Sequence, residues 1–298
     1  MTTFQNLFQQ LINAISMGSS YALMAIGLAM VFGILRLINF AHGDLIMVGS
    51  YTVLILQVAG LPFSVAALVG ITVSTLAGLI MERVAYRPIR GAPGVAMLLT
   101  SFAVTIFLEN LAILIFSPIS RAFPVPAILT QALQYGTLRI SSLDLITTAI
   151  AIILLVLLTL FVTHTKVGIS MRAASEDLLA AQLMGINVNV VIASAFAIGS
   201  MLAGVSGLLW SARVGKVDPL MGFYPVLKAF VATVIGGMGN LPGAVLGAYV
   251  LGFLEVLLQG LLPAALTPFR DAFVFLALIV LLLFRPNGIL GRTDREKI

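Results

Sequence analysis

Cysteine is absent from this 298-residue chain, and charged residues make up only 9% of it. Without cysteine the chain cannot form disulfides or thiolate metal sites, and two histidines do not make an H-E-x-x-H zinc site. We therefore expect no metal site. Soluble domains carry about 25% charged residues, so the composition excludes an ordinary soluble fold.

A nucleotide-binding motif of the G-x-x-x-x-G-K-[ST] type is also missing, because no lysine has glycine before it and serine or threonine after it. We expect no cofactor on this chain and no ATP hydrolysis by it. No basic residue precedes Arg36, so the start lacks the charged region of a signal peptide, and the first apolar run is expected to be a retained span.

Apolar residues account for 60% of the chain, and a helix needs about 20 of them to cross a bilayer. The sequence predicts an all-α, polytopic transmembrane helix bundle of about 8–10 spans in a single domain, residues 1–298. Nine candidate spans can be delimited, of which the seventh is short: residues 11–34, 43–59, 64–81, 96–116, 143–162, 190–210, 226–237, 243–262 and 272–284.

The basic residues predict the orientation, since cytoplasmic loops are rich in lysine and arginine. Ten fall on the side of the central loop: Arg36, Arg83, Arg87, Arg90, Lys166, Arg172, Arg285, Arg292, Arg295 and Lys297. Six fall on the other side: Arg121, Arg139, Arg213, Lys216, Lys228 and Arg270. We expect an external N-terminus and a cytoplasmic C-terminus. Membrane orientation explains the basic excess better than binding of nucleic acid does. The external loop 117–142 contains three prolines and is expected to be irregular.

The central loop, residues 164–189, carries a short helix pattern outside the membrane. Ser175 is a good N-cap, Glu176 and Asp177 follow in the expected first turn, and Gly185 offers a left-handed stop. Leucines and Met184 form an apolar side around Ala180 and Ala181. Such a helix is typical of a docking element for another protein, and the alternative is a merely solvated loop.

Polar residues surround the predicted start of the second span. Asn39, His42 and Asp44 lie at its entry, and Tyr51 lies two turns further on. Ionisable groups near hydrocarbon are costly unless they are paired or hydrated. One interpretation places Asn39 and His42 at the interface as helix caps, with Asp44 in the first turn beside the positive end of the dipole. The other interpretation places all four residues along a translocation path.

Further polar groups lie inside other predicted spans. Glu109 and Asn110 are in the fourth and Glu255 is in the eighth, and intramembrane carboxylates are functional candidates. A structural ion pair and a path lining are both open for each glutamate. The glycine-rich run 236–243 predicts a non-helical turn, which is either a tight cytoplasmic hairpin or a broken-helix site of the kind transporters use.

Several stretches together resemble one family. They are SYALMAIGLAMVFGILRLINFAHGDLIMVGSY (20–51), ERVAYRPIRGAP (82–93), MRAASEDLLAAQLMGINVNVV (171–191), LKAFVATVIGGMGNLPGAVLGAYVLG (227–252) and RPNGILG (285–291). The chain is similar to the permease subunits of branched-chain amino-acid ABC importers, of the LivH type. The stretches occur in the expected order along most of the chain.

The resemblance implies a translocation path formed with a second, LivM-like permease in a bacterial plasma (inner) membrane. It implies cytoplasmic ATP-binding subunits that hold ATP and Mg, and an external or periplasmic substrate-binding protein that delivers leucine, isoleucine or valine. By position, the resemblance implies that the permease is coupled to its ATPase through these residues of the central loop: Arg172, Glu176, Asp177, Ala180, Ala181 and Gly185.

Other functions are compatible with the same residues. Relatives of this kind also handle urea, amides or other amino acids. A secondary transporter would use an ion gradient, with Glu109, Glu255 or Asp44 as the proton or cation group. A membrane scaffold without transport is a third class. The central helix favours the ATPase-driven permease, because a secondary transporter needs no docking element for an ATPase.

Overall fold

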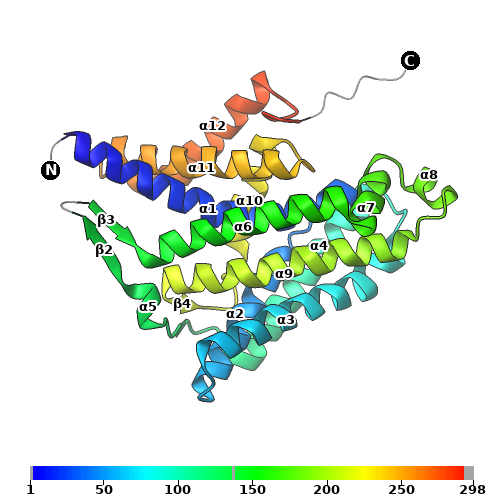
Figure 1. Ribbon diagram of the computed structural model, residues 1–298, viewed down its shortest axis with the longest axis horizontal. Coiled ribbons are helices and arrows are strands. Elements are labelled where there is room, and N and C mark those ends of the chain that lie inside the picture. Colours follow the sequence, from blue (N-terminus) through cyan, green and yellow to red (C-terminus); the bar gives the residue numbers. More distant parts are fainter. Residues whose placement is uncertain (1–2, 136–137, 292–298) are drawn as a thin grey trace.

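Long apolar helices lie side by side in the structure, a computed structural model that describes residues 3–135 and 138–291 (Figure 1). Within these residues seven helical segments are long and apolar enough to cross a membrane. Their helices are α1 (Thr3–Leu35), α3 (Phe63–Met81), α4 (Gly94–Phe116), α6 (Ser142–His164), α9 (Val188–Val214), α11 (Leu241–Leu261) and α12 (Arg270–Phe284). The prediction of an all-α, multi-pass bundle is confirmed.

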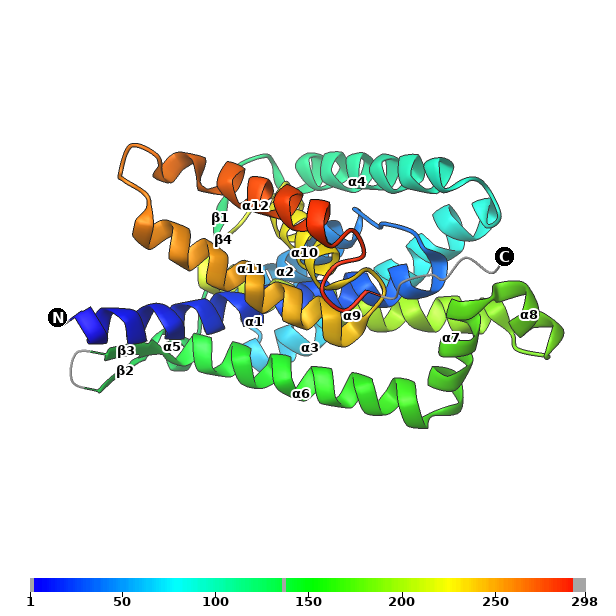
Figure 2. The same cartoon turned by 90° about the horizontal axis from the view of Figure 1, so that it is seen from above.

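The remaining two predicted spans are short helices, α2 (His42–Val58) and α10 (Phe223–Gly236), and both lie inside the bundle (Figure 2). The ring of His42, at the first residue of α2, contacts Gly27 of α1 beside Gly199, near the middle of α9. The chain therefore leaves α1, turns back through residues 36–41, and begins α2 deep in the bundle. The predicted caps Asn39 and His42 were wrong, because no side chain caps α2 and Ala41 is its N-cap residue. Asp44 lies in the first turn of α2, as expected.

The entries of α2 and α10 touch each other. A Cβ atom added to Gly43 would lie 2.3 Å from the carbonyl oxygen of Gly222, and one added to Gly222 would lie 2.2 Å from the carbonyl oxygen of Gly43. Real Cβ atoms do not approach backbone this closely, so glycine is required on both sides. Small residues at helix crossings are the usual way in which membrane proteins bring backbones together. The two short helices are thus locked to each other at their first turns.

One end of the bundle carries the N-terminal turn of α1 and a hairpin of β2 (Ala132–Tyr135) and β3 (Leu138–Ser141) (Figure 1). Between α4 and this hairpin, β1 (Arg121–Ala122) pairs antiparallel with β4 (Lys216–Val217), and α5 (Ala127–Thr130) follows. The loop expected to be irregular therefore contains ordered segments. The prolines confine each segment to a few residues, since each removes a backbone donor.

The opposite end carries the central loop, which forms α7 (Lys166–Glu176) and α8 (Leu178–Leu183). Helix α3 also ends on this side, through a π-helical turn η1 (Glu82–Tyr86) and a 3₁₀ turn η2 (Arg87–Ile89), and a short 3₁₀ turn η3 (Thr267–Phe269) precedes α12. Three basic residues assigned to this side (Arg292, Arg295 and Lys297) lie outside the described residues.

A tight turn joins α10 to α11 at residues 236–243, which confirms the predicted non-helical turn. Gly237 and Gly239 both have positive φ, and the Asn240 side chain accepts a hydrogen bond from the Gly243 amide. The segment after α12 folds back onto this turn: the amides of Ile289 and Leu290 donate to the carbonyls of Ile235 and Gly236. The end of the described chain is thereby tied to the short helix α10.

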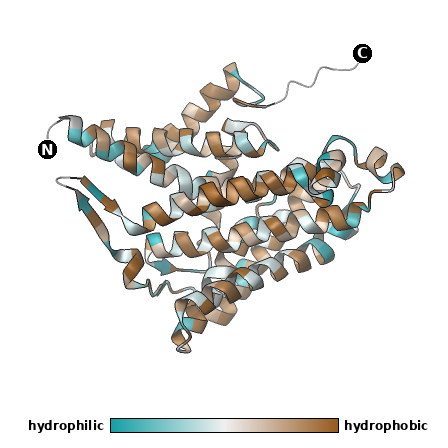
Figure 3. Ribbon diagram, viewed as in Figure 1, coloured by the Kyte–Doolittle hydropathy of each residue, from teal (hydrophilic) through white to brown (hydrophobic). Residues whose placement is uncertain are grey.

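The outer helices present apolar side chains to the surroundings. Helices α6 and α12 are strongly hydrophobic along their length (Figure 3), and few of their residues are buried against the rest of the bundle. The inner part of α1 contributes many of the most buried side chains, from Tyr21 to Val31. An apolar exterior around a packed central helix suits a protein whose solvent is lipid.

Candidate functional site

Three carboxylates are more than nine-tenths buried in the described chain: Asp44, Glu82 and Glu255. Two of them have cationic partners. Glu82 pairs with Arg90, whose guanidinium also donates to the Asn189 side chain at the start of α9. Glu255 pairs with Lys228 and accepts a hydrogen bond from the Tyr21 hydroxyl at 2.7 Å. Buried charges in membranes are normally paired in this way.

Lys228 corrects the orientation count, because it does not lie in an external loop. It sits inside α10 with no exposed surface and bridges Glu255 of α11 and Asp271 of α12, the latter at 2.9 Å. Its ammonium also lies over the rings of Tyr224 and Phe275. The number of basic residues assigned to the external side therefore falls from six to five. Glu255 belongs to an ion pair, the first of its two interpretations.

Asp44 is the buried carboxylate that has no ion pair within the described residues. Its Oδ2 atom also lacks a hydrogen-bond partner there. The Thr105 hydroxyl and the Glu109 carboxyl, both on α4, belong to its electrostatic surroundings. An unpaired carboxylate at this depth costs several kcal/mol unless a ligand, water or proton compensates it.

The other predicted residues of α2 differ in their surroundings. Asn39 is buried and accepts a 2.7 Å hydrogen bond from the Tyr86 hydroxyl. His42 Nε2 and the Tyr51 hydroxyl are buried without partners in the described chain. The Tyr51 ring stacks on Phe116 of α4, with centroids 4.3 Å apart. Asn39 is thus fixed by a bond, whereas His42 and Tyr51 keep free polar atoms.

Helix α4 contributes Glu109, Asn110 and Thr105. Glu109 is half-buried and, like Asp44, forms no ion pair in the part of the chain described here. Asn110 is exposed, and its amide donates to the carbonyl of Ile106 one turn earlier. Asn110 therefore points away from the other candidates. Thr105 is 8% exposed and its hydroxyl has no partner in the described chain.

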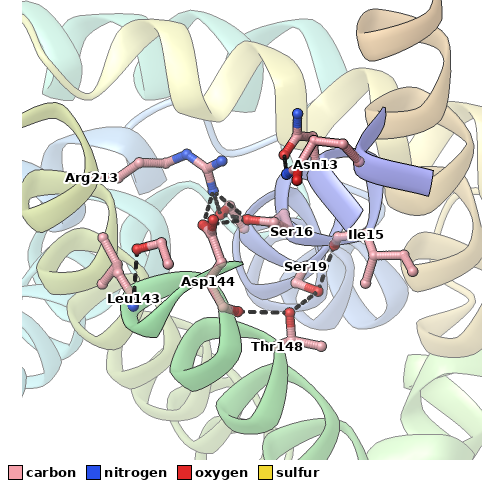
Figure 4. Close-up of polar contacts among 11 residues, drawn as sticks. Asn13, Ile15, Ser16, Ser19, Leu143, Asp144, Thr148 and Arg213 are labelled. Atoms are coloured by element: carbon pink, nitrogen blue, oxygen red, sulfur yellow. Dashed lines mark hydrogen bonds and ion pairs between the residues drawn. The ribbon is translucent and has the colours of Figure 1, made fainter. Parts of the chain in front are cut away.

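A second polar cluster, at the end of the bundle that carries the hairpin, was not predicted (Figure 4). Asp144 of α6 accepts a 2.5 Å hydrogen bond from Ser16 of α1 and lies 3.4 Å from the Arg213 guanidinium of α9. Arg213 also donates to Ser16 and Ser20 at 3.0 Å. These contacts join three helices, and no spacing in the sequence could have paired residues so far apart.

The central arm, residues 166–187, differs in detail from its prediction. Ser175 is not an N-cap: it lies in the last turn of α7, where its hydroxyl donates to the Arg172 carbonyl. Glu176 ends α7 rather than opening the next helix. Asp177 is the N-cap of α8 and accepts bonds from the amides of Leu179 and Ala180 at 2.8 and 3.0 Å. Gly185 has φ +82°, so the left-handed stop is confirmed.

Five of the six predicted coupling residues are exposed on this arm: Arg172, Glu176, Asp177, Ala180 and Gly185. Ala181 is buried and faces the bundle. The apolar side chains of Leu179, Leu183 and Met184 are between 74 and 88% exposed. An exposed apolar patch on a polar arm is a mark of a protein contact.

Comparison with known proteins gives full-length matches. A family model described as "Branched-chain amino acid transport system / permease component" matches residues 10–284. The chain is 38% identical over 312 residues to the high-affinity branched-chain amino acid transport system permease protein BraD of Pseudomonas aeruginosa, which covers 100% of both chains. It is 36% identical over 309 residues to permease protein LivH of Escherichia coli, covering 99% of both.

The chain belongs to this permease family. A xylose transport system permease protein of Escherichia coli matches 31% of this chain at 36% identity over 99 residues. No solved structure matched. The family and the apolar helices make this a multi-pass membrane transport protein, and the resemblance drawn from the sequence is confirmed.

Two features of the permease escaped sequence reasoning. Lys228 was counted with the external residues although it lies near the start of the predicted seventh span, 226–237. Its partner Glu255 lies 27 residues away on another helix. Thr105 was not predicted as a neighbour of Asp44. Thr105 lies four residues, or about one helical turn, before Glu109, and this spacing places the two side chains on the same face of the helix.

Proposed function

We propose that this permease forms, with a second permease subunit, the membrane path of an ATP-driven importer for leucine, isoleucine and valine. The observation that carries the proposal is the identity of 36–38% with two permeases of branched-chain amino acid transport over essentially the whole of each chain. It covers both the membrane core and the central arm, so it reflects the whole molecule and not one shared motif.

The central arm is the proposed contact with a cytoplasmic ATPase. Its exposed apolar side chains Leu179, Leu183 and Met184 would enter a groove on the partner, and the acidic pair Glu176 and Asp177 would fix the orientation. Ala181 would act indirectly, because it packs α8 against the bundle. Closure of two ATPases around ATP and Mg would move α8 and, through α7, the helices behind it.

The proposed orientation in a bacterial inner membrane places α7 and α8 in the cytoplasm, with the N-terminus outside and the C-terminus inside. It is supported by the basic residues near the α7–α8 end and by the position of the N-terminal turn at the other end. An external binding protein would then deliver substrate to the end that carries the β2–β3 hairpin.

Copurification tests the assembly. The tagged chain, extracted with mild detergent from its native membrane, should bring with it an ATP-binding subunit and a second permease that mass spectrometry identifies. Proteoliposomes made from that complex, with ATP inside or outside as the orientation requires, should take up leucine in the presence of the binding protein. Uptake that needs an ion gradient and no ATP would contradict the proposal.

A further inference from the structure

The contact between α2 and α4 gathers buried polar atoms that have no partner. We call it the α2–α4 seam: Phe40, Asp44 and Tyr51 on or next to α2, and Phe102, Thr105, Glu109 and Phe116 on α4. Asp44 Oδ2, Thr105 Oγ1 and the Tyr51 hydroxyl are three of the seven buried side-chain N and O atoms without a hydrogen bond in the described chain. Native proteins rarely leave such groups unsatisfied, so their clustering points to a missing partner.

The charge of the seam defines that partner. Glu82 and Glu255, the other two deeply buried carboxylates, each have a cation within the chain, whereas Asp44 faces a hydroxyl and a second carboxylate. Two carboxylates at membrane depth attract a cation strongly. The Thr105 hydroxyl lies near enough to interact with the Asp44 carboxyl, but Asp44 Oδ2 and Thr105 Oγ1 have no partner with hydrogen-bond geometry in the described chain. A group that donates to both would satisfy them.

The surroundings of the seam define the rest of the ligand. Phe40 stacks on Phe102 at 4.8 Å on one side of the polar residues, and Tyr51 stacks on Phe116 on the other side. Apolar side chains such as Val48, Val104 and Leu108 lie along the same two helices. Beyond the Phe40–Phe102 stack, residues 35–38 and the first turns of α4 line a groove of ≈ 440 Å³. A small molecule with one cationic group and an aliphatic body fits this arrangement.

We infer that the α2–α4 seam binds the ammonium group of an aliphatic α-amino acid, with Asp44 Oδ2 and Thr105 Oγ1 as acceptors and Glu109 adding negative charge. The inference rests on the proposed function, which it deepens by naming the residues that hold the substrate during passage. In this arrangement the Phe40–Phe102 stack closes the seam toward one end of the bundle, and the Tyr51–Phe116 stack closes it toward the other. Movement of α4 away from α2 would open either stack.

Uptake by the reconstituted complex gives the first test. With a saturating concentration of leucine-loaded binding protein, Asp44→Asn should lower the rate of leucine uptake by at least roughly 30-fold. Thr105→Val should lower it by roughly tenfold. Both effects are those expected when a hydrogen bond to a buried charge is lost. Thr100→Val is the matched control on the same helix, because its hydroxyl already donates to the Ala96 carbonyl. It should stay within about twofold of the unmodified complex.

Thiol labelling gives a second test that does not depend on the rate. The chain has no cysteine, so Thr105→Cys introduces a single thiol whose modification is read by the mass of this chain. The cationic reagent 2-aminoethyl methanethiosulfonate should react with it in the full complex during ATP turnover. Leucine with its binding protein should slow the reaction at least about fivefold, whereas sodium ions or 4-methylpentanoate, which lacks the ammonium group, should not. Thr100→Cys should show no leucine protection.

The outcomes separate the inference from the function. Leucine uptake that is normal in Asp44→Asn, together with a Thr105→Cys thiol that leucine does not protect, overturns the seam and leaves the importer intact. Protection by sodium alone also overturns it, since the site would then take an inorganic cation. A complex with unmodified permease that moves no branched-chain amino acid overturns both.

Discussion

Lys228 sits in a short helix with its ammonium fully enclosed by two carboxylates and two aromatic rings. Membrane proteins accept such a group where the charges balance and every donor has an acceptor. Here Lys228 and Arg270 balance the charges of Glu255 and Asp271, and the Tyr21 hydroxyl completes the bonding of Glu255. The cluster ties α10 to α1, α11 and α12 at a single point.

Replacing Lys228 with methionine should destabilise the permease by about 3–5 kcal/mol, because Glu255 is left buried without a cation. The measurement is the unfolding transition in mixed detergent micelles. Lys228→Met combined with Glu255→Leu should recover most of the loss, since no uncompensated charge is left at that position. Lys216→Met is the control: its side chain is 55% exposed and 3.8 Å from Asp218, so its effect should stay within about 0.5 kcal/mol.

Glu109 and Asn110 are adjacent in the sequence but differ in what their side chains can do. Glu109 shares the electrostatic environment of Asp44, whereas Asn110 is exposed and bonded to its own helix. Glu109→Gln should therefore reduce leucine uptake severalfold with normal expression, and Asn110→Ala should leave it unchanged. Equal uptake by the two variants would make Glu109 a structural residue.

At the scale of elements, α8 is a two-turn helix whose existence depends on its ends. Asp177 accepts bonds from two amides at its start, and Gly185 adopts positive φ after its end. Asp177→Ala should remove about 1 kcal/mol of helix stability and lower the amount of ATPase recovered with the permease. Ser175→Ala is the matched control, because Ser175 caps nothing. Equal recovery with both variants would argue against α8 as the contact.

Gly185 provides an independent test of the same element. Gly185→Val forces a β-branched residue into a left-handed conformation, which costs about 1–2 kcal/mol, although no neighbouring atom lies in the way. Substrate-stimulated ATP hydrolysis by the complex should fall while insertion of the permease is normal. Gly185→Asn should retain most activity, since asparagine tolerates this conformation. Loss of membrane insertion in Gly185→Val would contradict the assigned role.

The elements themselves were largely predictable from the sequence, since long apolar runs leave few alternatives to membrane helices. The ends of the helices were less predictable. Ser175 and Asp177 are two residues apart, and both are good N-cap residues. The choice between them depends on α7, which runs from Lys166 to Glu176 and includes Ser175. Whether α2 begins at the interface or at the centre was also undecidable, because that depends on contacts of Gly43 with Gly222, far along the chain.

The candidate site divides in the same way. Asp44, Tyr51 and Glu109 stand out as polar residues in apolar spans, so their residue types alone nominate them. That Glu255 is already neutralised while Asp44 is not follows from which helices adjoin, and a single sequence does not contain that information. The neighbours in the folded structure, and not the residue type, decide whether a buried carboxylate belongs to an ion pair or lacks a partner.

For the whole molecule, the expected sidedness can be measured because the chain contains no cysteine. Gln131→Cys, near the β2–β3 hairpin, should react with a membrane-impermeant maleimide added to intact cells. Gln182→Cys, in α8, should react only after the cells are opened. Both positions are exposed, so access depends on the side of the membrane. Reversal of the two would place the arm beyond the reach of any cytoplasmic ATPase.

The pairing of Lys228 with Glu255 has a consequence for how the chain enters the membrane during synthesis. Helix α10 is 14 residues long and carries an unneutralised lysine until α11, which supplies the glutamate, has emerged from the ribosome. Because this helix is apolar but shorter than a membrane span and carries the lysine, we expect it to enter the membrane together with α11 as a hairpin. A nascent chain arrested between the two would hold α10 in water.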